Sequence, residues 1–147
     1  MTIAAWVKAY NAAAWTDGTR RDAVYLFVDA SNYIEICKNA PNNLLSFIYL
    51  AGGTAKQIDH SISSTAWTHL ALSITRAGDA MIVYVNGTQS GATASGLGAW
   101  AGALHNSYTL IGAQNKAPGV VWNGWIAHAA IWAAALSDVE VGYLARK

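Results

Sequence analysis

The chain has 147 residues, of which 12% are charged and 54% are hydrophobic, and its formal net charge is +1. This length suits one domain with a continuous core. The scattered basic residues argue against nucleic-acid binding, which needs a concentrated basic face, and no apolar run approaches the roughly 20 residues of a membrane span.

Short apolar runs separated by Gly, Asn, Asp and Ser follow one another along the first half, which is typical of a β-sandwich or barrel. The first expected strand covers residues 3–9, where Ile, Ala and Val alternate with Ala, Trp and Lys. Turn-forming residues at 39–43 and 52–53 separate the strands that follow. Those strands are expected at residues 24–29, 33–38, 44–50 and, more weakly, 55–60.

A β-hairpin is the clearest feature of the second half. The segment WTHLALSIT at residues 67–75 places three aliphatic side chains on one face, and residues 81–85 return beside it. Asn86-Gly87 then supplies two residues that tolerate positive φ, which is a strong turn signal. Residues 91–102 are Gly, Ala and Ser with little pattern and are expected to form a long loop. Strands resume at 108–112 and 122–132.

Only the C-terminal segment has a helical pattern. Ser137 and Glu140 fit a capping box, in which the serine hydroxyl accepts from the Glu140 amide and the glutamate reaches back. Val139 and Leu144 then share one helix face. We therefore expect an all-β fold with a short C-terminal helix, in a single domain over residues 1–147.

Four segments, in order, resemble motifs of the concanavalin A-like lectin/glucanase superfamily, in its laminin G-like (LamG) branch. They are TIAAWVKA (2–9), WTHLALS (67–73), MIVYVNGTQSG (81–91), and YTLIGAQN followed by WNGWIAHAAIWAAALSDVEV. The resemblance spans nearly the whole chain. It implies a jelly-roll β-sandwich of antiparallel strands, an architecture often used for carbohydrate recognition.

Two departures from the family pattern bear on partners. Family members usually carry one or two strands before the position of Thr2, in the sheet that receives the C-terminal strand. Since the chain apparently lacks them, either a partner subunit completes the open edge or the domain does without the strand. The low charge favours a homo-oligomer or another partner, although abundant Ala also explains it. In addition, Ala127-His128 stands where the family often has an acidic pair.

No catalytic residues are expected. Glucanases of this superfamily use closely spaced carboxylates on one strand in a Glu-x-Asp-x-Glu pattern, which this chain lacks. Its only two glutamates are Glu35 and Glu140, and the second belongs to the helix cap. Cys37 lies in an alternating strand and is interpreted as a small core residue. The four histidines lack metal-ligand spacing in the sequence.

Calcium is the cofactor that the resemblance most often implies, held by oxygen ligands on loops. Asp29 and Asn32 lie in an oxygen-rich turn, and Asp59 is placed in another loop. Turn formation explains Asp and Asn at such positions at least as well. No cofactor is therefore required, and calcium stays an open alternative.

Tryptophans in or beside loops are the candidate ligand-binding residues. Trp15, Trp100 and Trp122 have polar neighbours, and their rings could stack on the C–H faces of a sugar or, equally, cap the core or fill a subunit contact. Hydrogen bonds to the sugar are assigned to Asp17, Asn106 and Asn115. The tryptophans inside strand motifs are interpreted as core residues, namely Trp6, Trp67 and Trp132.

These observations lead to two main hypotheses about function. The first is a non-catalytic recognition module that binds a glycan or a protein surface through loops at one rim of the sandwich. The alternative is a structural assembly protein, such as a phage or virus particle decoration or fibre component. A glycoside hydrolase comes third. No signal peptide is expected from residues 1–10, so the location is open, with a virion or an extracellular assembly as the alternatives considered.

Overall fold

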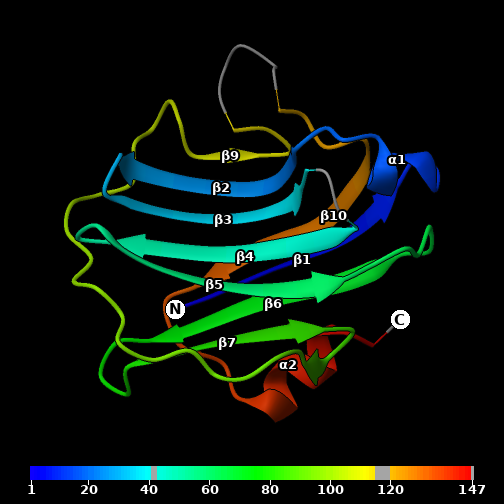
Figure 1. Ribbon diagram of the computed structural model, residues 1–147. Coiled ribbons are helices and arrows are strands. Elements are labelled where there is room, and N and C mark those ends of the chain that lie inside the picture. Colours follow the sequence, from blue (N-terminus) through cyan, green and yellow to red (C-terminus); the bar gives the residue numbers. More distant parts are fainter. Residues whose placement is uncertain (41–42, 115–119, 147) are drawn as a thin grey trace.

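The computed structural model describes residues 1–40, 43–114 and 120–146, which form two antiparallel sheets packed face to face (Figure 1). Sheet 1 has the strand order β10-β1-β6-β7-β8, and sheet 2 has the order β5-β4-β3-β2-β9. The strands of sheet 1 are β1 (Thr2–Ala9), β6 (Thr68–Thr75), β7 (Ala80–Val85), β8 (Thr88–Gln89) and β10 (Gly124–Trp132). The strands of sheet 2 are β2 (Arg21–Asp29), β3 (Asn32–Asn39), β4 (Leu44–Ala51), β5 (Thr54–Ser61) and β9 (Leu110–Ile111).

This arrangement confirms the expected all-β jelly-roll sandwich. Every strand expected from the sequence is present, and the chain passes from sheet 1 to sheet 2 and back twice. The turn after β7 has the expected left-handed backbone, with φ of 51° at Asn86 and 79° at Gly87. A short helix, α1 (Ala13–Thr16), was not expected, and the side chain of Asn11 accepts a hydrogen bond from the Ala14 amide at 3.1 Å at its start.

The core lies between the sheets because alternate residues of each strand point inward. From sheet 1, Leu70, Leu72 and Ile74 are buried as the alternation of β6 predicts, and they belong to the same cluster as Ile36 and Phe47 of sheet 2. Each fully buried side chain of this size stabilises the fold by about 1.5–3 kcal/mol. The opposite faces of both sheets are therefore the surfaces left for other contacts.

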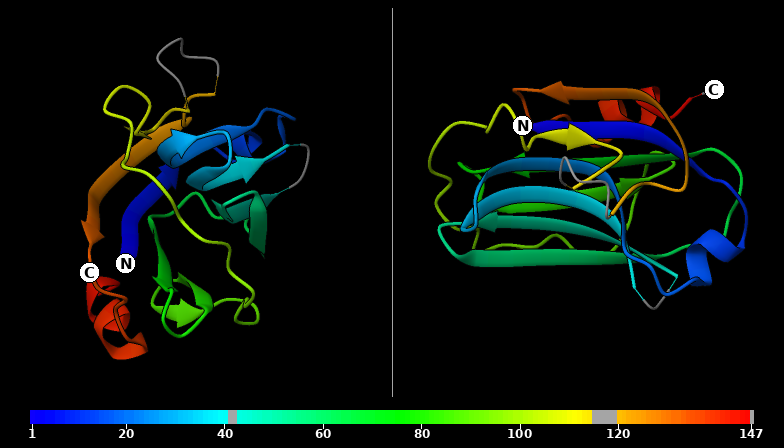
Figure 2. Two further views of the ribbon diagram at one scale, coloured as in Figure 1. Left: turned by 90° about the vertical axis from the view of Figure 1, so that its left-hand side faces the viewer. Right: turned by 90° about the horizontal axis from the view of Figure 1, so that it is seen from above.

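The outer face of sheet 1 is covered in part by helix α2 (Asp138–Leu144), and Figure 2 shows the helix on that side of the sandwich. Val141 of the helix packs with Ala71 and Tyr84 of the sheet. The capping box is present as expected: the Ser137 hydroxyl accepts from the Glu140 amide, and the Glu140 carboxylate accepts from the Ser137 amide at 2.8 Å. Neither helix of the described residues is long and apolar enough to cross a membrane.

The strand β10 forms one edge of sheet 1. Its only strand neighbour among the described residues is β1, and the ladder between them is interrupted by a register shift. At this shift His128 adopts a left-handed backbone with φ of 50°, so β10 carries a bulge. That a partner strand completes this edge stays a prediction.

Candidate functional site

The outer face of sheet 2 carries three rows of side chains that run across strands β2 to β5. Each row is set by the antiparallel register, because residues that face each other across strands point to the same side. The first row is Asp22, Cys37, Ser46 and Asp59, the second is Tyr25, Glu35, Ile48 and Gln57, and the third is Phe27, Tyr33, Leu50 and Ala55. The face is therefore polar along the first row and becomes aromatic and apolar along the third.

A hollow of about 430 Å³ opens beside the aromatic end of this face, lined by Tyr25, Phe27, Tyr108 and Gln114. The Tyr108 side of the hollow comes from the loop 101–109, which is held to β2 by hydrogen bonds to the backbone of Phe27. The His105 amide donates to the Phe27 carbonyl at 2.7 Å, and the Thr109 hydroxyl donates to the same carbonyl at 3.3 Å. The hollow is thus a formed feature rather than a gap between free loops.

Its aromatic rings pack on one another. The rings of Tyr25 and Phe27 stack with centroids 5.6 Å apart, and Tyr108 meets Phe27 edge to face at 6.0 Å. His105 lies against Tyr108 at 4.7 Å, and Tyr33 extends the group on the β3 side at 5.6 Å from Tyr25. Such pairs contribute about 0.5–1.5 kcal/mol each beyond their buried area. The cluster therefore holds its rings in place before any ligand arrives.

Exposure differs sharply between these rings. Tyr108 is 43% exposed, whereas Tyr25 is only 8% exposed. Burial raises the pKa of the Tyr25 phenol to about 12, and the nearby Glu35 carboxylate raises it further. The phenol therefore stays protonated at neutral pH and can donate a hydrogen bond, while Tyr108 presents the ring that a ligand can reach.

A buried charged group adjoins the hollow on the same face. Arg20 donates from Nε to Glu35 Oε1 at 3.0 Å and lies 3.5 Å from Asp22 Oδ1. Both carboxyl side chains are at most 1% exposed. Burial raises the pKa of Asp22 to about 8, and the neighbouring Glu35 carboxylate reinforces the shift. At neutral pH this group therefore consists of a guanidinium, one carboxylate and one protonated carboxyl, with no net charge.

The structure places Trp15 and Trp122 in the core, which is one of the alternatives that the sequence leaves open for them. They are 2% and 7% exposed, belong to the core cluster, and meet edge to face with ring centroids 5.8 Å apart. The indole N–H of Trp15 donates to the Ser64 carbonyl at 2.9 Å. Both rings close one end of the sandwich, which is the core-capping alternative, and neither offers a face to a sugar.

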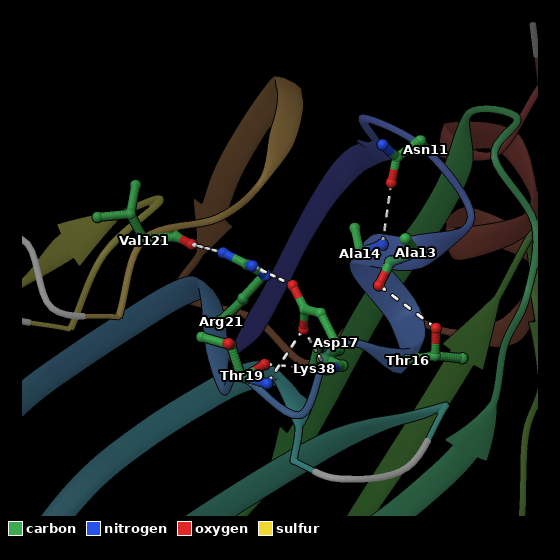
Figure 3. A network of polar contacts seen from close by, with 9 residues as sticks. All are labelled: Asn11, Ala13, Ala14, Thr16, Asp17, Thr19, Arg21, Lys38 and Val121. Carbon is green, nitrogen blue, oxygen red and sulfur yellow. Dashed lines mark hydrogen bonds and ion pairs between the residues drawn. The ribbon is translucent and has the colours of Figure 1, made fainter.

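Asp17 lies beside this closed end and belongs to an ion-pair network. Figure 3 shows its carboxylate facing Arg21 and Lys38, and it accepts from Lys38 Nζ at 3.1 Å and from the Thr19 amide at 3.0 Å. The Arg21 side chain is the main cause that holds the pKa of Asp17 well below its usual range. The oxygens of Asp17 are therefore engaged within the chain, which assigns this residue a structural role.

The remaining predicted residues lie in separate places. Trp100 is half-buried and stacks on Tyr49 with centroids 5.9 Å apart. Asn106 is exposed in the loop 101–109, where its side-chain oxygen accepts from the Ser107 hydroxyl. Asn106 shares the loop 101–109 with Tyr108 of the hollow. Asn115, which follows Gln114 of the hollow in the sequence, lies outside the described residues.

The three calcium candidates are not brought together. Asp29 Oδ1 accepts from the Ser31 amide and from the side chain of Asn32, as in an ordinary turn. The side-chain oxygen of Asn32 accepts from two backbone amides, those of Gly52 and Ala101.

Asp59 lies in the strand β5 rather than in a loop, and it accepts from Ser46 and Gln57. The register places it five residues along β5 from Thr54, the end nearest Asn32, which corresponds to about 17 Å. These residues therefore do not fit a shared calcium site.

Several solved structures share this architecture. Domain 4 of the extracellular arabinanase AbnA from Geobacillus stearothermophilus, solved with arabinotriose, superposes with a TM-score of 0.72 and 20% identity over 99% of this chain and 66% of that one. The heptameric SAP-like pentraxin from Limulus polyphemus superposes with a TM-score of 0.71 and 17% identity, over 99% of this chain and 69% of the pentraxin chain. The CBM40 module of the Ruminococcus gnavus IT-sialidase, bound to α2,3 sialyllactose, superposes with a TM-score of 0.68 and 10% identity, over 99% of this chain and 82% of the CBM40 chain.

At these identities the likeness establishes the fold alone. This chain spans about two thirds of the arabinanase domain, and no curated protein sequence matches it significantly. The model of one family, described as the concanavalin A-like lectin/glucanases superfamily, matches residues 1–142. The match covers nearly the whole chain and agrees with the observed two-sheet sandwich. The chain therefore belongs to the concanavalin A-like lectin/glucanase superfamily.

Proposed function

We propose that the chain is a non-catalytic carbohydrate-binding module that holds a neutral glycan in the hollow at the outer face of sheet 2. The observation that carries this proposal is the hollow itself, which is lined by the exposed Tyr108 together with Phe27 and Gln114. A sugar presents apolar C–H faces and hydroxyl groups, so a site of this kind needs aromatic surface and a few polar atoms.

The charge of the neighbouring group favours a neutral sugar. Among the described residues, Arg20 is a cation that acts on Tyr25 of the hollow, and it is already bound to Glu35 and close to Asp22. An acidic sugar would have to compete with Glu35 for this guanidinium, and the remaining group would then carry an unbalanced carboxylate. Neutral hexose or pentose residues meet no such penalty.

The same burial argues for binding rather than hydrolysis. A retaining glycosidase needs two carboxyl groups that both reach the scissile bond. Asp22 and Glu35 are close together, but both are fully buried, and Arg20 occupies one oxygen of Glu35. The arabinanase domain solved with arabinotriose and the CBM40 module solved with sialyllactose support a binding role for this fold.

A glycan array probed with the purified protein tests the proposal. We expect binding to a set of neutral glycans, and Tyr108→Ala should weaken it about tenfold, since a lost aromatic contact corresponds to roughly 1.4 kcal/mol. Tyr143→Ala is the matched control, because this tyrosine is 59% exposed on α2, at the other sheet. No binding to any glycan, or equal weakening by both substitutions, contradicts the proposal.

An assembly role is the second candidate, and the free edge of β10 favours it. This strand contains no Lys, Arg, Asp, Glu or Pro, which are the residues that usually discourage pairing at an edge. Ile131 and Trp125 on it are 51% and 48% exposed. A closed oligomer whose size falls to a monomer in Ile131→Lys, measured by light scattering after gel filtration, is the result that this candidate predicts. A monomeric wild type argues against it.

A further inference from the structure

We propose that Asp22, Glu35 and Cys37 form a binding site for a divalent metal ion of the zinc group, on the outer face of sheet 2. The site is distinct from the aromatic hollow and goes beyond glycan binding. Asp22 and Cys37 face each other across β2 and β3, and Glu35 follows one position along the same face of β3. Their ligand atoms all lie within 4.8 Å of one another.

Two buried oxygens mark the place for an ion. Oδ2 of Asp22 and Oε2 of Glu35 have no hydrogen-bond partner from any other described residue, and in the metal-free protein the proton of Asp22, donated to Glu35, links them. A buried carboxyl oxygen without a partner is strongly unfavourable, so native proteins usually satisfy it with a donor or an ion. Both side chains, and that of Cys37, are fully buried. An ion between the three side chains would satisfy both oxygens at once.

The donor set indicates which ion would bind. Zinc and its heavier relative cadmium accept a thiolate together with carboxylate oxygens, whereas calcium and magnesium prefer oxygen alone. Zinc binds sulfur at about 2.3 Å and oxygen at about 2.0–2.2 Å. Side-chain rotations of a modest size bring three atoms that lie within 4.8 Å of one another to these distances.

The charges balance only when the ion is divalent. With the ion bound, two carboxylates and one thiolate carry three negative charges, which the ion and the guanidinium of Arg20 neutralise. Without the ion, Arg20 neutralises Glu35, and protons neutralise Asp22 and Cys37. Binding therefore exchanges one divalent ion for two protons and leaves the buried group neutral in both states.

Access to the site runs past Arg20. Its side chain is 36% exposed and is the one member of the group that reaches solvent, since the side chains of Asp22, Glu35 and Cys37 are buried. A rotation of this side chain opens a path for the ion, and its contact with Glu35 closes the site again. Binding is therefore expected to be slow in the folded protein and faster during refolding.

Cadmium absorption is the direct test, because a thiolate bound to Cd²⁺ gives an ultraviolet charge-transfer band that carboxylates alone do not give. The protein is stripped with a chelator and titrated with CdCl₂, both when folded and during refolding, so that slow entry cannot hide the site. We expect one equivalent to bind with the band, and calorimetry in two buffers should show release of two protons per ion.

The variants separate the site from incidental binding. Cys37→Ser should abolish the band, and Asp22→Asn should weaken binding at least tenfold, whereas Asp59→Asn, an exposed carboxylate in the same row, should leave both unchanged. Zinc should raise the thermal midpoint of the wild type but not that of Cys37→Ser. Absence of the band after refolding, or an equal midpoint shift in Cys37→Ser, overturns the proposal. None of these readouts depends on a glycan. Failure of the metal site would therefore leave the proposed glycan binding untouched, and failure of glycan binding would leave the metal site untouched.

Discussion

Replacing Asp17 with alanine is expected to lower the free energy of unfolding by about 3 kcal/mol, because a buried positive charge then loses its counter-ion. The side chain of Lys38 is 0% exposed, and among the described residues its ammonium group donates to two acceptors, the Asp17 carboxylate at 3.1 Å and the Thr19 carbonyl at 2.9 Å (Figure 3). Removing the carboxylate leaves the ammonium with a single neutral partner in a region closed by Trp15 and Trp122.

Chemical denaturation at neutral pH measures this loss, and a second substitution distinguishes its cause. In the double variant Asp17→Ala with Lys38→Met, an unbranched apolar chain replaces the lysine, so most of the stability should return. A loss below about 1 kcal/mol in the single variant would place the pair among ordinary surface ion pairs. Failure of Lys38→Met to restore stability would show that Asp17 acts through Arg21 or the loop instead.

The second large effect is a loss of stability with rising pH in the metal-free protein. Folding raises the pKa of Asp22 from an ordinary 3.8 to about 8, chiefly through burial. Between these values the folded state holds a proton that the unfolded state has released, so the unfolding free energy falls as pH rises. The contribution is complete below about pH 4 and is lost above about pH 8. One pKa unit corresponds to about 1.4 kcal/mol, so the loss is on the order of a few kcal/mol.

Asp22→Asn should remove this dependence. The amide of asparagine is neutral at every pH and can donate to Glu35 as the protonated carboxyl does, so the variant should be more stable than the wild type at pH 8. Denaturation curves at several pH values, in the presence of a chelator, provide the measurement. Burial lowers the pKa values of His60 and His69, so these two groups raise the stability with rising pH within the same range, in the wild type and in the variant alike. The readout is therefore the difference in unfolding free energy between Asp22→Asn and the wild type, and a difference that does not grow from pH 4 to pH 8 contradicts the assignment.

The fold could be predicted from the sequence because its signals are local. Alternation, the Asn86-Gly87 turn and the capping box at Ser137 each depend on a few neighbouring residues, and all three are present in the structure. Helix α1 was not predicted, because its four residues are too few to show a periodic pattern in the sequence.

The tryptophans show where local reasoning fails. Trp15 and Trp122 lie in or beside loops, so the sequence left a binding surface, a core cap and a subunit contact open for them, and the structure places both in the core cluster. Trp6 and Trp67 lie within or beside strands and were interpreted as core residues. In the structure both are only half-buried, and they line a hollow at the outer side of sheet 1. Alternation predicts that a residue faces one side of a sheet, but not which side.

The candidate site was missed because it is made by pairing between strands. Tyr25 and Phe27 share a face of β2, and Glu35 and Cys37 share a face of β3, so each half of the site is visible in the sequence. A bulge between Asp22 and Val24 brings Asp22 onto that face, and no sequence signal marks it. The register of β2 and β3 then brings these two groups of side chains together. The loop 101–109 adds Tyr108, which is more than 80 residues from Phe27 in the sequence.

The central claim is that a glycan binds at the outer face of sheet 2, and an amide-resolved NMR titration with the strongest array ligand tests it most directly. The account predicts that the largest shift changes fall on Phe27, Tyr108 and Gln114 and their immediate neighbours, and that Tyr108→Ala removes them. Changes concentrated around Trp100, or on the outer face of sheet 1 near Trp6 and Trp67, would contradict the account and move the binding surface elsewhere.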